Sequence, residues 1–171
     1  MEDIIALMDK IIEEHKVLFK EMETLETVAN DAHALAGLSK SKEVFMPGRF
    51  GQKSGLQKLQ ELIQTIEPGL LAHFNREETA LLRAFEQYGD KELSSALHSL
   101  LLEHEDLRNH MTHCKEHVAE LMGERLSRHV WEAKAHDMRA HITNTRRLLE
   151  THALLEMKLF NTVRHKLAGK K

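Results

Sequence analysis

Two segments of the chain repeat the same pair of metal-binding residue types at the same spacing. "HFNREETALL" places His73 four residues before Glu77, and "HALLEMKLF" places His152 four residues before Glu156. Residues four apart lie on one face of a helix, so each pair offers an imidazole nitrogen and a carboxylate to one point. These are ligands of iron, manganese and zinc. The spacing therefore predicts metal chemistry, provided that other elements supply ligands at the same level.

Four apolar stripes with alternating four- and three-residue spacing predict the elements that position these pairs. The second and fourth stripes contain the His-Glu pairs, and the first and third contain His15 and His104. Such stripes are typical of helices that pack in bundles, and only 5% of residues are aromatic, which disfavours strands. The sequence predicts an all-α fold in one domain, residues 1–171, with helices at about 2–33, 55–87, 91–122 and 134–167.

The stripes also predict which side chains face the core. The second continues from Glu77 to Ala80 and Ala84, and the third passes through Leu100 to His104. Pro68 and Gly69 interrupt the second stripe, so a kink or a split into two segments is expected there.

Turn signals separate the stripes. "YGD" at 88–90 predicts a short turn with Asp90 as the N-cap of the third helix, and Gly123 suits the end of that helix. A long loop is expected from about residue 34 to 54, whose apolar residues would cap the far end of the bundle or form a partner surface, the former being favoured. They are Val44, Phe45, Met46 and Phe50.

An up-down-up-down antiparallel four-helix bundle brings six polar residues of the stripes to one level. Their heights agree to within roughly one turn, at roughly 18 Å from one end of the bundle. Burying unpaired polar groups costs a few kcal/mol each, and isolated carboxylates cost more. A bound metal removes that cost. The predicted ligands are His15, His73, Glu77, His104, His152 and Glu156.

A count of ligand atoms favours two ions. If Glu77 and Glu156 each bridge two metals, they fill about four coordination positions, the histidines fill about four more, and an oxo or hydroxo bridge fills about two. Two six-coordinate ions then keep about two positions open for a small ligand. This arrangement favours redox-active iron, with zinc or manganese as possible substitutes.

With these motifs, including "EEHKVL" and "LLEHEDLR", the chain resembles the hemerythrin-like HHE domain over nearly its whole length. The ferritin-like alternative uses Glu-x2-His and is disfavoured. The resemblance implies a non-haem di-iron centre on the six residues above, and dioxygen, nitric oxide or peroxide as ligands.

The resemblance is nearer to one subgroup. Oxygen-carrying hemerythrins place a second His four residues from the first on the third helix, whereas here Leu100 and Leu107 flank His104 on the stripe and residue 108 is Arg. The pattern resembles the four-His, two-Glu subgroup, which includes proteins linked to repair of iron centres after nitrosative stress. In that subgroup a Glu matching Glu103 lies near the cluster and could relay protons. A partly exposed Glu on a helix flank is an equal alternative.

Composition excludes other classes. The net charge is −3, with 24 basic and 27 acidic residues intermixed, so no nucleic-acid or membrane partner is expected. The acidic "MEDIIALMDK" start is unlike a signal peptide, and a cytoplasmic protein is expected. The single cysteine, Cys114, is expected to be a small buried hydrophobe.

The remaining histidines and polar candidates are interpreted as non-ligands. His113 and His117 have ligand spacing but lie off the core stripe, so a solvated helix face is expected. Met111 and Thr145 are expected only to pack, and Tyr88 receives no role. The other surface or loop histidines are expected to be His33, His98, His110, His129, His136, His141 and His165.

Three functions stay open. The leading hypothesis is a di-iron protein that binds, senses or detoxifies oxygen or nitric oxide. The second is an enzyme that reduces nitric oxide or peroxide, or delivers iron to damaged clusters. The third is an interaction bundle with a structural metal.

Overall fold

The computed structural model describes residues 2–38, 50–123 and 126–170. Within these ranges every regular element is helical, as predicted. The elements are α1 (Glu2–Leu38), α2 (Phe50–Arg76), the π-helical turn η2 (Glu77–Leu81), α3 (Leu82–Tyr88), α4 (Lys91–Leu101), α5 (Glu103–Leu121) and α6 (Arg128–Ala168).

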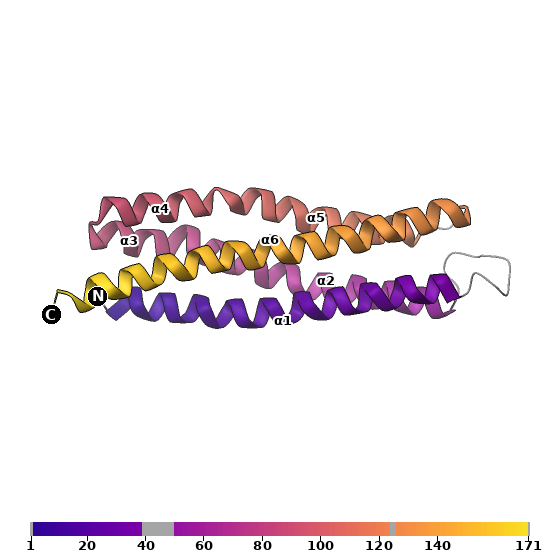
Figure 1. The fold of residues 1–171 in the computed structure, drawn as a ribbon, viewed down its shortest axis with the longest axis horizontal. Helices are drawn as coiled ribbons and strands as arrows, with labels where there is room; N and C mark the ends of the chain where they lie inside the picture. Colours follow the sequence, from indigo (N-terminus) through magenta and orange to yellow (C-terminus); the bar gives the residue numbers. More distant parts are fainter. Residues whose placement is uncertain (1, 39–49, 124–125, 171) are drawn as a thin grey trace.

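The helices form a bundle of long rods lying side by side (Figure 1). The first rod is α1, the second is α2 with η2 and α3, the third is α4 with α5, and the fourth is α6. The α1 helix packs against α2 and α6, and α5 packs against the same two helices. Helix α1 begins and α6 ends at the same end of the bundle (Figure 1). No helix in the described ranges is long and apolar enough to cross a membrane.

Local signals set two of the helix ends. The Asp90 side chain accepts a hydrogen bond from the Leu93 amide at 3.1 Å and begins α4, as predicted. Gly89 has φ of 82° and ends α3 in the left-handed conformation that favours glycine.

The last helix begins at Arg128, so the expected start near residue 134 is wrong. The Ser127 side chain accepts a hydrogen bond from the Val130 amide at 3.4 Å and supplies an N-cap. The added turn buries Trp131, whose indole nitrogen donates to the Leu121 carbonyl at 3.2 Å.

The first two rods reach further into the predicted loop, because α1 continues to Leu38 and α2 begins at Phe50. Residues 39–49, with Val44, Phe45 and Met46, lie outside the described residues. The expected capping of the bundle by this segment therefore stays a prediction.

Pro68 does not split α2, which runs unbroken from Phe50 to Arg76. Pro68 and Gly69 are both exposed, so the carbonyl freed by the missing N–H can bind water. Ile66 and Leu70 on either side are buried and hold the helix against its neighbours.

The irregular turn of this rod is η2, and it corrects the predicted register. A π-helical turn accommodates one extra residue. After Glu77 the buried residues are Leu81 and Phe85, whereas the predicted Ala80 and Ala84 are only partly buried. A similar shift occurs in the third rod next to the turn at residue 102, where Leu101 is buried and Leu100 only partly so.

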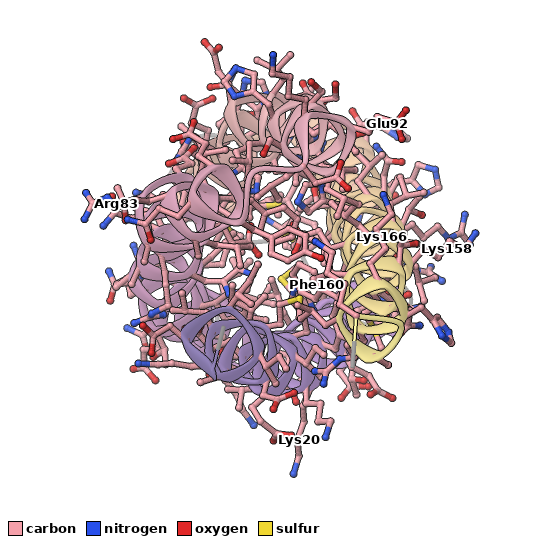
Figure 2. All side chains as sticks on the ribbon, turned by 90° about the vertical axis from the view of Figure 1, so that its left-hand side faces the viewer. Lys20, Arg83, Glu92, Lys158, Phe160 and Lys166 are labelled. Atoms are coloured by element: carbon pink, nitrogen blue, oxygen red, sulfur yellow. The ribbon has the colours of Figure 1, made fainter. Side chains whose placement is uncertain are left out.

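The core consists of two apolar clusters. One is built around Leu25, Ile63 and Trp131, and the other around Met8, Phe85 and Phe160. Figure 2 looks at the left-hand end of Figure 1 and shows Phe160 between the rods, whereas Lys20 and Arg83 point outward. The buried polar residues of the bundle belong to neither cluster.

Candidate metal centre

The structure brings together all six side chains that the sequence proposed as ligands. They come from every rod of the bundle and are buried, with exposed fractions between 0% and 4%. They are His15 (α1), His73 (α2), Glu77 (η2), His104 (α5), and His152 and Glu156 (α6).

These residues form two groups of four that share both carboxylates. Within each group, one nitrogen or oxygen atom of every residue lies within 4.8 Å of the others. His15 and His73 belong to one group and His104 and His152 to the other, while Glu77 and Glu156 belong to both.

Glu77 lies between the two groups. Its Oε1 is 2.8 Å from Nε2 of His73, and its Oε2 is 2.9 Å from Nε2 of His104. One oxygen therefore faces each group. This is the arrangement of a carboxylate that can bridge two cations.

Glu156 repeats this arrangement from the opposite rod. Its Oε2 is 3.2 Å from Nε2 of His15, and its Oε1 contacts Nε2 of His152. The Nε2 atoms of His104 and His152 are 3.1 Å apart, so both nitrogens face the same point.

The donor atoms fit a metal better than they fit one another. Both oxygens of Glu77, both oxygens of Glu156 and both nitrogens of His15 are buried and make no well-directed hydrogen bond with the described residues. Uncompensated buried carboxylates are costly, and a cation between them would satisfy their oxygens. Imidazole and carboxylate without thiolate suit iron, manganese or zinc.

The same crowding perturbs the pKa values of these groups. Burial lowers the pKa of His15, but the carboxylates of Glu156 and Glu77 outweigh it and raise that pKa to about 9. The same causes raise the pKa of His104 to about 9. Burial raises the pKa of Glu77, but the imidazoles of His104, His15 and His73 hold it well below its usual range. Protons therefore compete with any metal for these atoms.

Three of the four histidines meet a further carboxylate at Nδ1, on the side away from the centre. A hydrogen bond at this nitrogen fixes the orientation of a ligand ring and raises its basicity, which applies to His104 and His152, whereas Nδ1 of His73 makes only a looser ion-pair contact. The three pairs are His73 Nδ1 with Glu14 Oε1 (3.6 Å), His104 Nδ1 with Glu78 Oε1 (3.2 Å) and His152 Nδ1 with Glu103 Oε2 (2.7 Å).

Arginine holds two of these carboxylates. Arg76 contacts Glu14, and Nη2 of Arg108 donates to both oxygens of Glu78 at 2.7 and 2.6 Å. Glu103 has no lysine or arginine partner in the described part of the chain, and its side chain is 49% exposed. It is therefore the carboxylate of the three that is most open to solvent.

Glu103 was singled out from the sequence, whereas Glu14 and Glu78 were not. Each carboxylate stands next to a candidate ligand in the sequence, Glu14 before His15 and Glu78 after Glu77. Neighbouring residues point about 100° apart on a helix. The Glu next to one candidate ligand therefore points toward a candidate ligand on another rod. A Glu adjacent to a candidate ligand in the sequence was the signal that could have predicted Glu14 and Glu78.

A small cavity adjoins the centre. It has about 20 Å³ of space for the centre of a water-sized molecule, enough for about one small molecule. His15, His73 and His152 border it. Its other lining residues are Leu18, Phe19, Met22, Leu70, Phe74, Leu149 and Ala153.

Cys114, Met111 and Thr145 are buried near this layer and pack as predicted. Sγ of Cys114 lies 3.6 Å from Oγ1 of Thr145, and burial raises the thiol pKa to about 11. The thiol is therefore neutral at physiological pH. Tyr88 ends α3, and Lys170 lies over its ring.

The expectation of solvated histidines holds for His98, His129, His136 and His165, which are exposed. It is incomplete for four others. The ring of His141, on α6, contacts the rings of His110, His113 and His117, on α5. Only His113 of these is fully exposed. The side chain of His33 is outside the described residues. The helical spacing of residues 110, 113 and 117 is visible in the sequence. Their contact with a histidine of another rod is not.

Comparisons with known proteins add family membership. No curated protein and no solved structure matches the chain. The family model described as Hemerythrin HHE cation binding domain matches residues 6–163, a range that contains all six candidate ligands. The chain therefore belongs to the hemerythrin HHE cation-binding domain family.

Proposed function

We propose that this protein carries two iron ions and binds, senses or detoxifies a small ligand such as oxygen, nitric oxide or peroxide. The observation that carries the proposal is the sharing of both buried carboxylates by two groups of donors. A site for one ion does not require two carboxylates that each direct one oxygen to each of two groups of histidines. The proposed bundle is up-down-up-down, which is supported by α1 beginning and α6 ending at one end (Figure 1).

Each side chain has a distinct role in this proposal. His15 and His73 would hold one ion, His104 and His152 would hold the other, and Glu77 and Glu156 would contact both. Bound iron supplies open coordination positions and a change of oxidation state. Zinc or manganese suits the same donors and would substitute for iron, and metal analysis distinguishes the three.

The cavity supports a small apolar ligand. Its size admits about one diatomic molecule. Apolar side chains form most of its wall, so a larger or charged molecule would lose its hydration without finding polar partners. The chain itself thus limits access by size and polarity.

Glu103 favours a second candidate, an enzyme that reduces nitric oxide or peroxide, or one that repairs iron centres. Reduction consumes protons as well as electrons from an external donor. A half-exposed carboxylate 2.7 Å from Nδ1 of His152 is placed to exchange protons between solvent and the buried layer. Turnover with a chemical reductant would favour this candidate over a carrier or sensor.

The decisive test measures the metal content and absorption spectrum of the purified protein before and after exposure to oxygen or nitric oxide. We expect about two irons per chain, near-ultraviolet charge-transfer bands, and spectral changes on ligand addition. Zinc occupancy with no ligand-dependent spectrum would support a structural metal in an interaction bundle and would overturn the proposal.

Ligand variants test the residue assignment. His104→Ala and Glu77→Ala are each expected to lower iron occupancy sharply, because each removes donor atoms from the shared layer. His98→Ala is the matched control, since His98 is an exposed histidine of the same rod. Iron occupancy is read by metal analysis after gel filtration, and equal occupancy in all three variants would refute the assignment.

A further inference from the structure

A second group of histidines lies outside the six-residue layer. His110, His113 and His117 follow one another on α5, and His141 faces them from α6. The centroid of the His141 ring lies 5.2 Å from that of His110, 5.8 Å from that of His113 and 5.1 Å from that of His117. We call these four residues the α5–α6 histidine cluster.

The helix spacing explains why three imidazoles meet a fourth. Residues three, four and seven apart lie along one face of a helix, and α5 packs against α6 along its length. His110 is six residues beyond His104, which is about 9 Å along the helix axis. The cluster is therefore separate from the centre described above.

Hydrogen bonds leave one nitrogen of His141 free to bind a cation. Its Nε2 lies 3.0 Å from the backbone carbonyl of His110. A carbonyl only accepts, so Nε2 carries the hydrogen, and Nδ1 of the neutral ring holds a lone pair. A ring oriented by a backbone carbonyl is a usual feature of histidine metal ligands.

His110 supports this arrangement through its backbone. Its carbonyl oxygen accepts the hydrogen bond that orients the ring of His141. Its own ring is held by a 3.6 Å ion pair between Nε2 and Oδ2 of Asp106.

The charge state of the cluster also suits a cation. Burial lowers the pKa of His141, and the neighbouring imidazoles of His117, His110 and His113 lower it further, against the opposing effect of its backbone hydrogen bond. A metal binds neutral imidazole, so no proton has to leave this ring at neutral pH.

We propose that the α5–α6 histidine cluster binds one divalent transition-metal ion of the zinc type, with His113, His117 and His141 as ligands. The observation that carries the proposal is the gathering of the rings around His141. In a tetrahedral site with metal–nitrogen distances of 2.0–2.1 Å, ring centroids stand about 5 Å apart. The distances from the centroid of His141 to those of His113 and His117, 5.8 and 5.1 Å, approach that value.

The nitrogens of this cluster do not converge as those of the six central residues do. His113 is exposed and His117 is partly exposed, so both rings have room to change rotamer. We expect the site to close by rotation of these side chains, without movement of the helices. The bound ion would connect α5 to α6 outside the six-residue layer, on the side of the apolar cluster that contains Trp131.

The experiment titrates Zn²⁺ into the full-length protein, loaded with its central metal, by calorimetry and equilibrium dialysis. Wild type is expected to bind one Zn²⁺ per chain more than the double variant His113→Ala/His117→Ala. His141→Ala is expected to weaken this binding at least about tenfold. Any zinc that enters the central layer does so in all variants, so it cancels in the comparison.

The double variant His98→Ala/His129→Ala is the control, because it removes two exposed histidines from other positions. It is expected to bind zinc as wild type does. Circular dichroism checks that every variant is folded. Equal zinc binding by wild type and the His113→Ala/His117→Ala variant, or an equal loss in the control, would overturn the proposal. Neither result would affect the test of the central iron site.

Discussion

At the scale of single residues, the carboxylates behind three candidate ligands differ in their partners, because arginine pairs with two of them and solvent reaches the third. Arginine side chains occupy oxygens of Glu14 and Glu78. The half-exposed side chain of Glu103 contacts His152 and stays open to water. Proton traffic, if the reaction needs it, is therefore expected through Glu103.

The first prediction concerns Glu103→Gln. The glutamine side chain can still accept a hydrogen bond from Nδ1 of His152, but it cannot take up a proton at physiological pH. We expect iron content to stay unchanged and reductive turnover of nitric oxide or peroxide to fall by about tenfold or more. Metal analysis and turnover with a chemical reductant measure the two effects.

Glu105→Gln is the matched control, because it removes a carboxylate from the same stretch of α5 on an exposed face. It is expected to leave turnover unchanged. Equal losses in the two variants would show that overall charge near α5 matters and that the contact between Glu103 and His152 does not.

The second prediction follows from the pKa values of the ligands. In protein stripped of metal, the pKa of His15 and His104 is raised from 6.5 to about 9. Their contribution to stability is fully present below pH 6.5 and is lost as the pH rises through about 9. The pKa of Glu77 and Glu156 is lowered from 4.5, so their contribution is present above that pH and lost as the pH falls.

The stripped protein is therefore expected to resist urea better at about pH 6 than at about pH 9.5. The metal-loaded protein should show a smaller decrease over the same range, because its ligands are already deprotonated. Urea midpoints across this range measure both. A midpoint of the stripped protein that rises with pH would contradict the ion pairs inferred for this layer.

The candidate ligands could be predicted from the sequence because each lies on a stripe of otherwise apolar residues. A histidine at such a position is visible as an exception, as His104 is between Leu97 and Leu107. The residues that support the ligands could not be predicted in the same way. Glu14 and Glu78 lie at the edge of a stripe, where the rotation of a rod decides whether a side chain meets solvent or a neighbouring ligand.

At the scale of elements, the π-helical turn η2 is the feature that periodicity did not reveal. After Glu77 the sequence offers Ala80 and Ala84 at one spacing and Leu81 and Phe85 at another, and both sets are apolar. Packing selects the larger residues, and the ring of Phe85 lies 6.5 Å from that of Phe160. Which of the two sets is buried depends on the side chains of the opposite helix. The periodicity of one helix therefore cannot predict it.

The third prediction is that a variant lacking Thr79 folds. The π turn contains one residue more than an α-helix needs, and Thr79 is exposed. Its removal leaves Leu81 and Phe85 three and seven positions after Glu77, still on the buried face. We expect cooperative thermal unfolding, with full helical content by circular dichroism.

A variant lacking Thr65 is the control. Both threonines are exposed and donate a hydrogen bond to the carbonyl four residues earlier. Thr65 lies in the regular part of α2. Its removal rotates the preceding residues by about 100° relative to Ile66, so Leu59 and Ile63 leave the buried face. Losing such buried side chains costs about 2–5 kcal/mol each, which is enough to unfold a domain of ordinary stability. Similar unfolding of both variants would contradict the assignment of the extra residue to η2.

At the scale of the whole molecule, a polar layer separates two apolar clusters. The apolar stripes predicted from the sequence run through both clusters, but the division of the core into two was not predicted. The stripes could not fix all the helix ends, such as the start at Arg128, which depends on a cap and on the burial of Trp131. In the absence of metal the layer between the clusters is expected to cost stability, because its charged groups lose their hydration.

The last prediction compares two ways of removing this layer. Replacing all six buried polar residues with leucine joins the two apolar clusters into one. Because no charge is left without its partner, the sixfold variant is expected to be more stable than the metal-stripped parent by about 1–4 kcal/mol. The six positions are His15, His73, Glu77, His104, His152 and Glu156. Urea unfolding measures the difference.

The single variant Glu77→Leu is the opposite case. It removes one carboxylate and leaves Glu156 and the imidazoles of His15 and His104 buried with one partner fewer. It is expected to be less stable than the stripped parent by about 3–5 kcal/mol. If the sixfold variant were the less stable of the two, the polar layer would itself stabilise the fold without metal. The energetic reason for placing a cation between Glu77 and Glu156 would then be lost.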